Sequence, residues 1–84
     1  MKYHKYTDPS HGWLKVPYKK LVELGIENEI SEYSFTRGEY VYLEEDADLT
    51  RFKKDLEANG ETLDYELHIS DKRSKIRNYQ SYSK

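Results

Sequence analysis

The chain has 84 residues, no cysteine and a formal net charge of −2. A chain of this length forms one domain and buries only roughly 60–65% of its unfolded surface, which leaves little room for an enclosed active site beside a core. The absence of cysteine excludes disulfides, zinc-thiolate centres and thiol nucleophiles, and the net charge argues against coating nucleic acid through an overall positive field. Nine tyrosines and a 14% aromatic content argue against disorder.

The first quarter of the chain predicts a turn, a strand and a helix. Residues 7–12 hold Thr, Asp, Pro, Ser, His and Gly, which is a dense turn cluster. Residues 13–16 read as a short strand that Pro17 ends. Proline is favoured in the first helical turn, and glycine caps helices in a left-handed conformation. We therefore expect a helix from Tyr18 to Leu24, followed by its cap at Gly25.

Residues 30–43 are predicted to form a hairpin with its turn at Gly38. Apolar and polar positions alternate along its arms, as they do in half-buried strands. The second arm is expected to point Val41 and Leu43 inward and Tyr40 and Tyr42 outward.

The second half of the chain predicts one helix, one strand and a tail. Leu49, Phe52 and Leu56 form an apolar stripe at helical spacing, with Asp46 or Asp48 as the expected N-cap. The strict alternation of residues 63–69 predicts a strand with one buried face, which would contain Leu63, Tyr65, Leu67 and Ile69. The remainder, about 70–84, is polar and basic.

Together these elements predict one α+β domain spanning residues 1–84. We expect a small, mostly antiparallel sheet of three to four strands, including the central hairpin, with two helices packed on one face. The basic C-terminal segment, about 70–84, is expected to be a flexible or partly docked tail. Residues 1–6 have no apolar stretch typical of a signal peptide, and no run approaches the ~20 apolar residues of a spanning helix, so we expect no membrane association.

An exposed patch on the hairpin is the first candidate site. Tyrosine and arginine supply much of the energy at protein interfaces, and acidic neighbours steer the encounter. We expect a protein-binding surface made of Arg37, Tyr40, Tyr42, Glu44, Glu45 and Asp46. The acidic run at 44–48 has two further interpretations, which are helix capping and a cation site, although its spacing does not match an EF-hand loop.

The basic tail is the second candidate site. Basic and aromatic residues interleave there, and single-stranded nucleic acid is held by base stacking on tyrosine beside phosphate contacts. The residues for this alternative are Arg73, Lys75, Arg77, Tyr79 and Tyr82. The competing interpretation is a solvated tail that Ile76 and Tyr79 hold to the core.

The histidines and the single tryptophan are the remaining candidates. His4, His11 and His68 could join Asp8, Asp64 or Glu66 in a metal or acid–base site, but they are scattered in sequence, and we expect no shared site and no cofactor. Residues 11–13, His-Gly-Trp, form either a recognition loop or a turn that leads Trp13 into the core.

Several short motifs follow one another in fixed order along the chain. They are His11–Pro17 (HGWLKVP), Leu24–Ile26, Ile30-Ser31, Tyr33-Ser34, Arg37-Gly38, Tyr42–Asp46 (YLEED) and Ile76–Tyr79 (IRNY). This pattern resembles a family of small uncharacterised proteins encoded by bacteriophages, plasmids and other bacterial mobile elements. The resemblance implies an accessory role in the bacterial cytoplasm and a host or element protein as partner, including a host defence protein that the chain inhibits or modulates.

The leading hypothesis is a non-enzymatic protein-binding module. Its partner would be another protein or a second copy of the same chain in a homodimer. The chain has no Gly-rich phosphate loop, no nucleophile elbow and no His-Glu-x-x-His helix, which lowers the expectation of an enzyme. The alternatives are a nucleic-acid-binding module that uses the tail and a small enzyme with a site near His11 and the acidic run.

Overall fold

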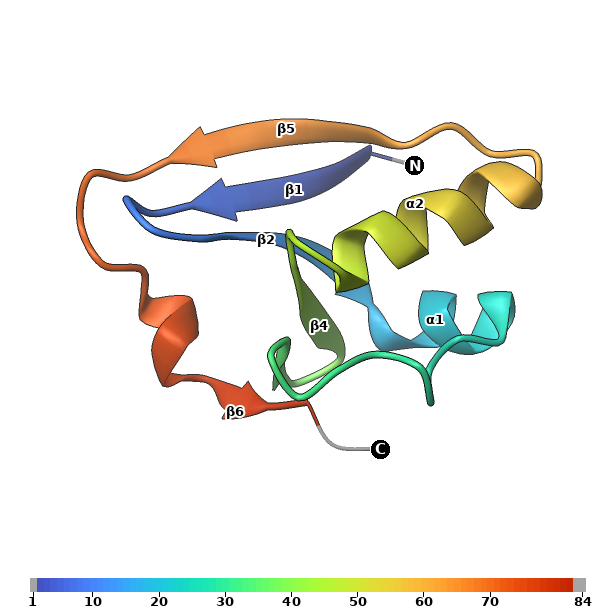
Figure 1. Ribbon diagram of the computed structural model, residues 1–84, viewed down its shortest axis with the longest axis horizontal. Helices are drawn as coiled ribbons and strands as arrows, with labels where there is room; N and C mark the ends of the chain where they lie inside the picture. Colours follow the sequence, from blue (N-terminus) through green and yellow to red (C-terminus); the bar gives the residue numbers. More distant parts are fainter. Residues whose placement is uncertain (1, 83–84) are drawn as a thin grey trace.

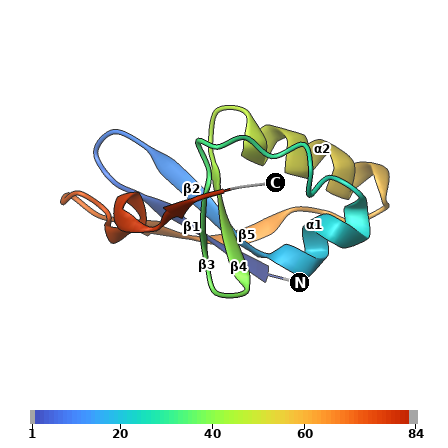
Figure 2. The same cartoon turned by 90° about the horizontal axis from the view of Figure 1, so that it is seen from below.

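The computed structural model describes residues 2–82 and contains a six-stranded mixed sheet with two helices on one face (Figures 1 and 2). The elements are β1 (Lys2–Thr7), β2 (Gly12–Pro17), α1 (Tyr18–Leu24), β3 (Phe35–Arg37), β4 (Tyr40–Glu44), α2 (Asp48–Ala58), β5 (Asp64–Ile69), the 3-10 helix η1 (Lys75–Asn78) and β6 (Gln80–Ser81). The strand order is β5-β1-β2-β4-β3-β6. The predicted α+β class is confirmed, but the sheet has more strands than the expected three to four.

The additional strands come from the two ends of the chain. β1 pairs antiparallel with β2 and parallel with β5, and this parallel pair makes the sheet mixed. The sequence gives no strand signal for residues 2–7, and only Tyr3 among them is buried. β6 pairs with β3 at the other edge. Because β1 is mostly polar and β6 has only two residues, pairing partners far along the chain specify these strands, and periodicity does not.

The main core lies between the sheet and the two helices. β2 and β4 contribute Leu14, Val16, Val41 and Leu43, and the helices contribute Leu21, Phe52 and Leu56, all almost fully buried. Burial of each such side chain stabilises the fold by roughly 1.5–3 kcal/mol. The predicted helix Tyr18–Leu24 is confirmed, including the left-handed cap at Gly25 with φ of 73°. The chain after α2 turns at Gly60 and leads into β5.

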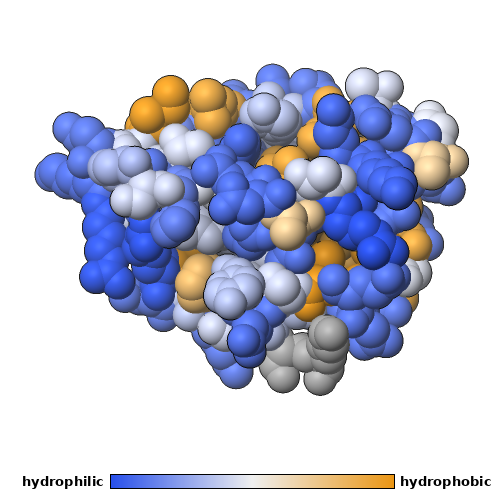
Figure 3. Space-filling model, in the orientation of Figure 1, coloured by the Kyte–Doolittle hydropathy of each residue, from blue (hydrophilic) through white to orange (hydrophobic). Residues whose placement is uncertain are grey.

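β5 differs from the prediction at its apolar face. Leu63 packs against the core, but Tyr65, Leu67 and Ile69 are 39%, 49% and 78% exposed. The reason is the position of β5 at the edge of the sheet. An apolar cluster is visible over the end of this strand at the upper left of Figure 3. A face predicted to be buried is therefore largely open.

A second core covers the opposite face of the sheet at the β4 side. Trp13, Tyr42 and Ile76 are buried together, with Phe35 and Tyr79 packed against them. The prediction that Tyr42 points outward into solvent is wrong, since it is only 8% exposed and its ring lies 5.1 Å from that of Tyr79. Burial, followed by the neighbouring Tyr79, raises the pKa of Tyr42 to about 12.

The C-terminal segment forms this cover, and it is ordered as part of the domain. η1 begins where the Ser74 side chain accepts a hydrogen bond from the Ile76 N–H, and Ile76 is buried. Tyr82 is 6% exposed, and its hydroxyl donates to the Glu27 carbonyl. Of the two expectations for this segment, flexible or partly docked, the docked one holds up to residue 82, with Ile76 and Tyr79 packed against the sheet. Residues 83–84 lie outside the described part. Within residues 2–82, no helix has the length and apolar character needed to cross a membrane.

Candidate binding groove

A groove of about 930 Å³ lies where four segments meet. Two of these segments are the turn before β2, with residues 11–13, and the loop before β3, with residues 31–33 and Phe35. The other two are residues 44–47, between β4 and α2, and the C-terminal segment, with Arg73, Arg77 and Ser81. Ligand sites commonly have volumes of ~300–1,000 Å³, so this groove has the size of a recognition site.

The loop before β3 is fixed by a buried carboxylate. Asp48 is 4% exposed and accepts hydrogen bonds from the Ser31 N–H at 3.1 Å and from the Ser31 hydroxyl at 2.6 Å. The fully buried Ser34 hydroxyl also donates to Asp48, and it accepts a bond from the Glu44 N–H at 3.0 Å. Buried polar groups satisfied in this way hold one conformation. The rim residues of this loop, Glu32 and Tyr33, are therefore held on a rigid base.

Glu44 forms the cap of α2. Its carboxylate accepts hydrogen bonds from the N–H groups of Asp46, Ala47 and Asp48 at 2.9, 2.7 and 2.8 Å. The prediction that Asp46 or Asp48 caps this helix is wrong, because the side chain that reaches the free N–H groups comes from the end of β4. A carboxylate at this position is favoured by the positive end of the helix dipole. Helix capping was one of the interpretations of the acidic run, and it holds for Glu44.

The other acidic side chains of the run face the groove more freely. Asp46 is exposed, and Glu45 lies 3.5 Å from the Lys5 ammonium. Gly12 allows close approach to Glu45, because a Cβ at that position would lie 2.5 Å from the Glu45 Oε2 atom and the side chain of Glu45 would have to move. The Glu45 N–H also donates to the Gly12 carbonyl at 3.0 Å. The glycine of the His-Gly-Trp sequence thus brings this turn against the acidic run.

An ion pair joins the first turn to the C-terminal segment. Arg77 donates to both oxygens of Asp8, at 2.6 and 3.0 Å, and its guanidinium lies 5.4 Å from the centre of the Trp13 ring. Asp8 also accepts the N–H groups of Ser74, His11 and Ser10. The guanidinium, and after it these N–H groups, hold the pKa of Asp8 far below its usual range. Arg77, which lines the groove, is therefore fixed to the turn that precedes β2.

The predicted protein-binding set is divided by the structure. Glu44, Glu45 and Asp46 line the groove, whereas Arg37, Tyr40 and Tyr42 lie outside it. Tyr40 is 40% exposed with the Lys15 ammonium 4.2 Å from its ring centre, and Arg37 lies over the Tyr79 ring at 5.1 Å. The single patch expected on the outer face of the hairpin does not form, because the C-terminal segment covers Tyr42 in its middle.

Most residues of the predicted nucleic-acid site are paired or packed within the domain. Arg77 is paired with Asp8, Tyr79 packs against Tyr42, and Tyr82 is buried in the main core. Arg73 and Lys75 are exposed. Stacking of successive bases needs accessible aromatic faces, and the structure leaves these two tyrosines without them.

Two of the three histidines, far apart in the sequence, come together in the fold. His11 lies at the groove with its ring 6.1 Å from that of Trp13. His4 and His68 meet on β1 and β5 beside Glu66, away from the groove. Sequence reasoning missed this meeting because it depends on the parallel strand pair. It also missed Glu32 and Tyr33 at the groove rim, for which spacing gave no signal.

Comparisons with protein-family models, with curated proteins and with solved structures give no match for this chain. The functional argument therefore depends on the groove and on the side chains around it.

Proposed function

We propose that this protein is a non-enzymatic protein-binding module that holds an extended segment of a partner in the groove. The observation that carries the proposal is the groove itself, which brings the His-Gly-Trp turn, the acidic run and the C-terminal segment together on a fixed frame. Rigid, preorganised surfaces lose less entropy on binding than mobile ones. The Asp48 network and the Asp8–Arg77 pair supply that rigidity.

The side chains of the groove favour a particular partner chemistry. Tyr33 is 74% exposed at the rim, which makes it available as an aromatic anchor. Glu32 and Asp46 are exposed nearby, and neither has an ion-pair partner within the described residues. Complementary charge steers association and fixes register. We therefore propose a partner segment in which a lysine or arginine flanks an apolar side chain.

The resemblance to proteins of phages, plasmids and other mobile elements supports a more specific proposal about the partner. An accessory protein of a mobile element acts in the bacterial cytoplasm, where a host protein or an element protein would supply the segment. Inhibition or modulation of a host defence protein is one such role. It follows from the resemblance and not from the groove, so it needs its own test.

A displayed random-peptide library tests the groove directly. We expect the selected peptides to be enriched in a basic residue next to an apolar one, and to lose binding to the double variant Glu32→Lys, Asp46→Lys. The matched control is Glu39→Lys with Glu57→Lys, which changes the net charge equally at exposed positions outside the groove. Retained binding by the groove variant, or equal loss in the control, would refute the proposal.

A further inference from the structure

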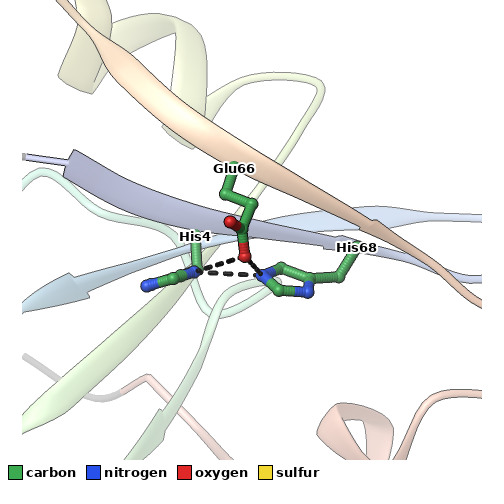
Figure 4. A group of neighbouring side chains, drawn as sticks. All are labelled: His4, Glu66 and His68. Carbon is green, nitrogen blue, oxygen red and sulfur yellow. Dashed lines mark hydrogen bonds and ion pairs between the residues drawn. The ribbon is translucent and has the colours of Figure 1, made fainter.

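His4, Glu66 and His68 form a cluster on the face of the sheet opposite the helices. In the parallel pair, His4 lies opposite Glu66, and His68 lies opposite Tyr6. Strand alternation puts all four on one face, while Tyr3 on the other face packs against Phe52 of α2. Figure 4 shows the three side chains converging, with the second ring nitrogen of each histidine pointing away from the cluster.

The distances within the cluster fit one small cation. His4 Nδ1 lies 3.0 Å from His68 Nε2, which lies 3.0 Å from Glu66 Oε2, and His4 Nδ1 lies 3.8 Å from the same oxygen. Ligands bound at about 2.0–2.1 Å in a tetrahedron are separated by roughly 3.3 Å, in the middle of these values. Three ligand atoms therefore already surround a point at which an ion would reach all of them with small side-chain adjustments.

The hydrogen bonding of the cluster leaves a lone pair facing inward. If His68 Nε2 carries the proton, it donates to the Glu66 carboxylate, and the lone pair of His4 Nδ1 faces the same N–H as a second acceptor. If His4 Nδ1 carries the proton, it donates to His68 Nε2, and Glu66 Oε2 then faces the same nitrogen at 3.0 Å without a donor from it. If both ring nitrogens carry protons, two N–H groups meet at 3.0 Å. A cation at the centre would satisfy all three atoms together.

Aromatic packing holds the two rings in position. Tyr6 stacks on His68 with ring centres 4.7 Å apart and planes 16° apart, and it lies 6.4 Å from the His4 ring. The ammonium of Lys15, which is paired with His4 across β1 and β2, lies over the Tyr40 ring instead. The rings are therefore ordered, and that nearby positive charge is directed to another aromatic ring.

We propose that His4, Glu66 and His68 bind a divalent transition-metal ion, with Zn²⁺ as the reference metal. Two imidazoles and one carboxylate suit Zn²⁺, Ni²⁺ or Cu²⁺ better than Mg²⁺ or Ca²⁺, which prefer oxygen ligands alone. The side chains are 45%, 52% and 39% exposed, so a fourth position faces solvent. Three protein ligands with an open position characterise sites that bind a water or an external ligand. The ion would also join β1 to β5, whose residues lie far apart in sequence.

Calorimetry on tag-free protein tests the proposal. We expect one Zn²⁺ per chain, no response to Mg²⁺, and a thermal midpoint that rises with Zn²⁺ concentration. His4→Ala and Glu66→Gln should each weaken Zn²⁺ binding by more than the roughly 10–100-fold that loss of an outer-shell partner costs. His11→Ala is the matched control, because it removes a histidine outside the cluster and should leave the affinity unchanged.

A spectroscopic measurement on the unaltered protein makes the test independent of the variants. Zn²⁺ should shift the ring resonances of His4 and His68 and leave those of His11 in place, and Co²⁺ should give the visible bands of a low-coordinate histidine site. Absence of stoichiometric binding, equal affinity in the His4→Ala variant, or shifts centred on His11 would each overturn the assignment.

Discussion

Tyr82 decides whether the C-terminal segment is part of the domain or a tail. Its ring belongs to the main core, its hydroxyl donates to the Glu27 carbonyl, and its N–H donates to the Ser34 carbonyl at 2.9 Å. Ser34 in turn holds the loop on the groove rim through Asp48. A change at position 82 should therefore affect both the stability of the domain and the shape of the groove.

Two substitutions separate the contributions of Tyr82. Tyr82→Phe removes the hydroxyl donor and should cost about 1 kcal/mol of unfolding free energy, which is a fall of ~4–8 °C in the midpoint for a domain of this size. Tyr82→Ala also removes a buried ring and should cost about 3–5 kcal/mol. Small domains have a total stability of only ~5–15 kcal/mol, so the alanine variant should be severely destabilised.

Thermal and urea unfolding followed by circular dichroism measure these differences. Tyr33→Ala is the control, since Tyr33 is 74% exposed and its loss should change the unfolding free energy by less than about 0.5 kcal/mol. A Tyr82→Ala variant as stable as the control would show that the segment is not anchored. The basic tail would then again be available to nucleic acid.

Three further outcomes follow from the structure. The lowered pKa of Asp8 means that the Asp8–Arg77 pair contributes stability above the ordinary carboxyl pKa of ~3.9, and that this contribution is lost as the pH falls below it. In acid, the unfolding free energy of Asp8→Asn should therefore depend less on pH than that of the unaltered chain, as urea unfolding at several pH values would measure. Because the pKa of Tyr42 is raised to about 12, the stability that its neutral hydroxyl contributes below pH ~10 is lost as the pH rises toward 12. In an absorbance titration of tyrosinate, Tyr42→Phe should remove the ionisation near pH 12. Gly12→Ala should cost about 1 kcal/mol, at the low end for overpacking because the flexible Glu45 can move. In a Glu45→Ala background the cost should fall, and the part that stays comes from the Thr7 Cγ2 atom 3.1 Å from the new Cβ. Equal costs in both backgrounds, measured by urea unfolding, would contradict this account of Gly12.

Local signals in the sequence were sufficient for the helices, for β2 and for β4. The first arm of the predicted hairpin is a strand only at β3, and residues 30–34 form a loop instead. Pro17 and Gly25 delimit α1, and the stripe of Leu49, Phe52 and Leu56 predicts α2, because these features act within a few residues along the chain. The alternation around Val41 likewise gave the buried face of β4. The α+β class follows from these elements alone.

The candidate sites were less predictable than the fold, because each depends on contacts between distant residues. The acidic run was predicted as part of a protein-binding surface, but its division into a helix cap, Glu44, and freer side chains depends on where α2 begins. Tyr42 carries the same alternation signal whether its face is open or covered. Tyr42 is covered because β6 pairs with β3 and brings the C-terminal segment over it. The residue spacing within the hairpin does not predict that pairing.

The sequence by itself determined the single cysteine-free α+β domain, its two helices and its inner strands, because propensity, capping and periodicity are local properties. Only the tertiary structure decided that β1 and β5 lie side by side, that His4 meets His68, and that the C-terminal segment covers Tyr42. Those contacts join residues that lie far apart in the sequence. Their register is set by burial over the whole domain, which no short window of sequence contains.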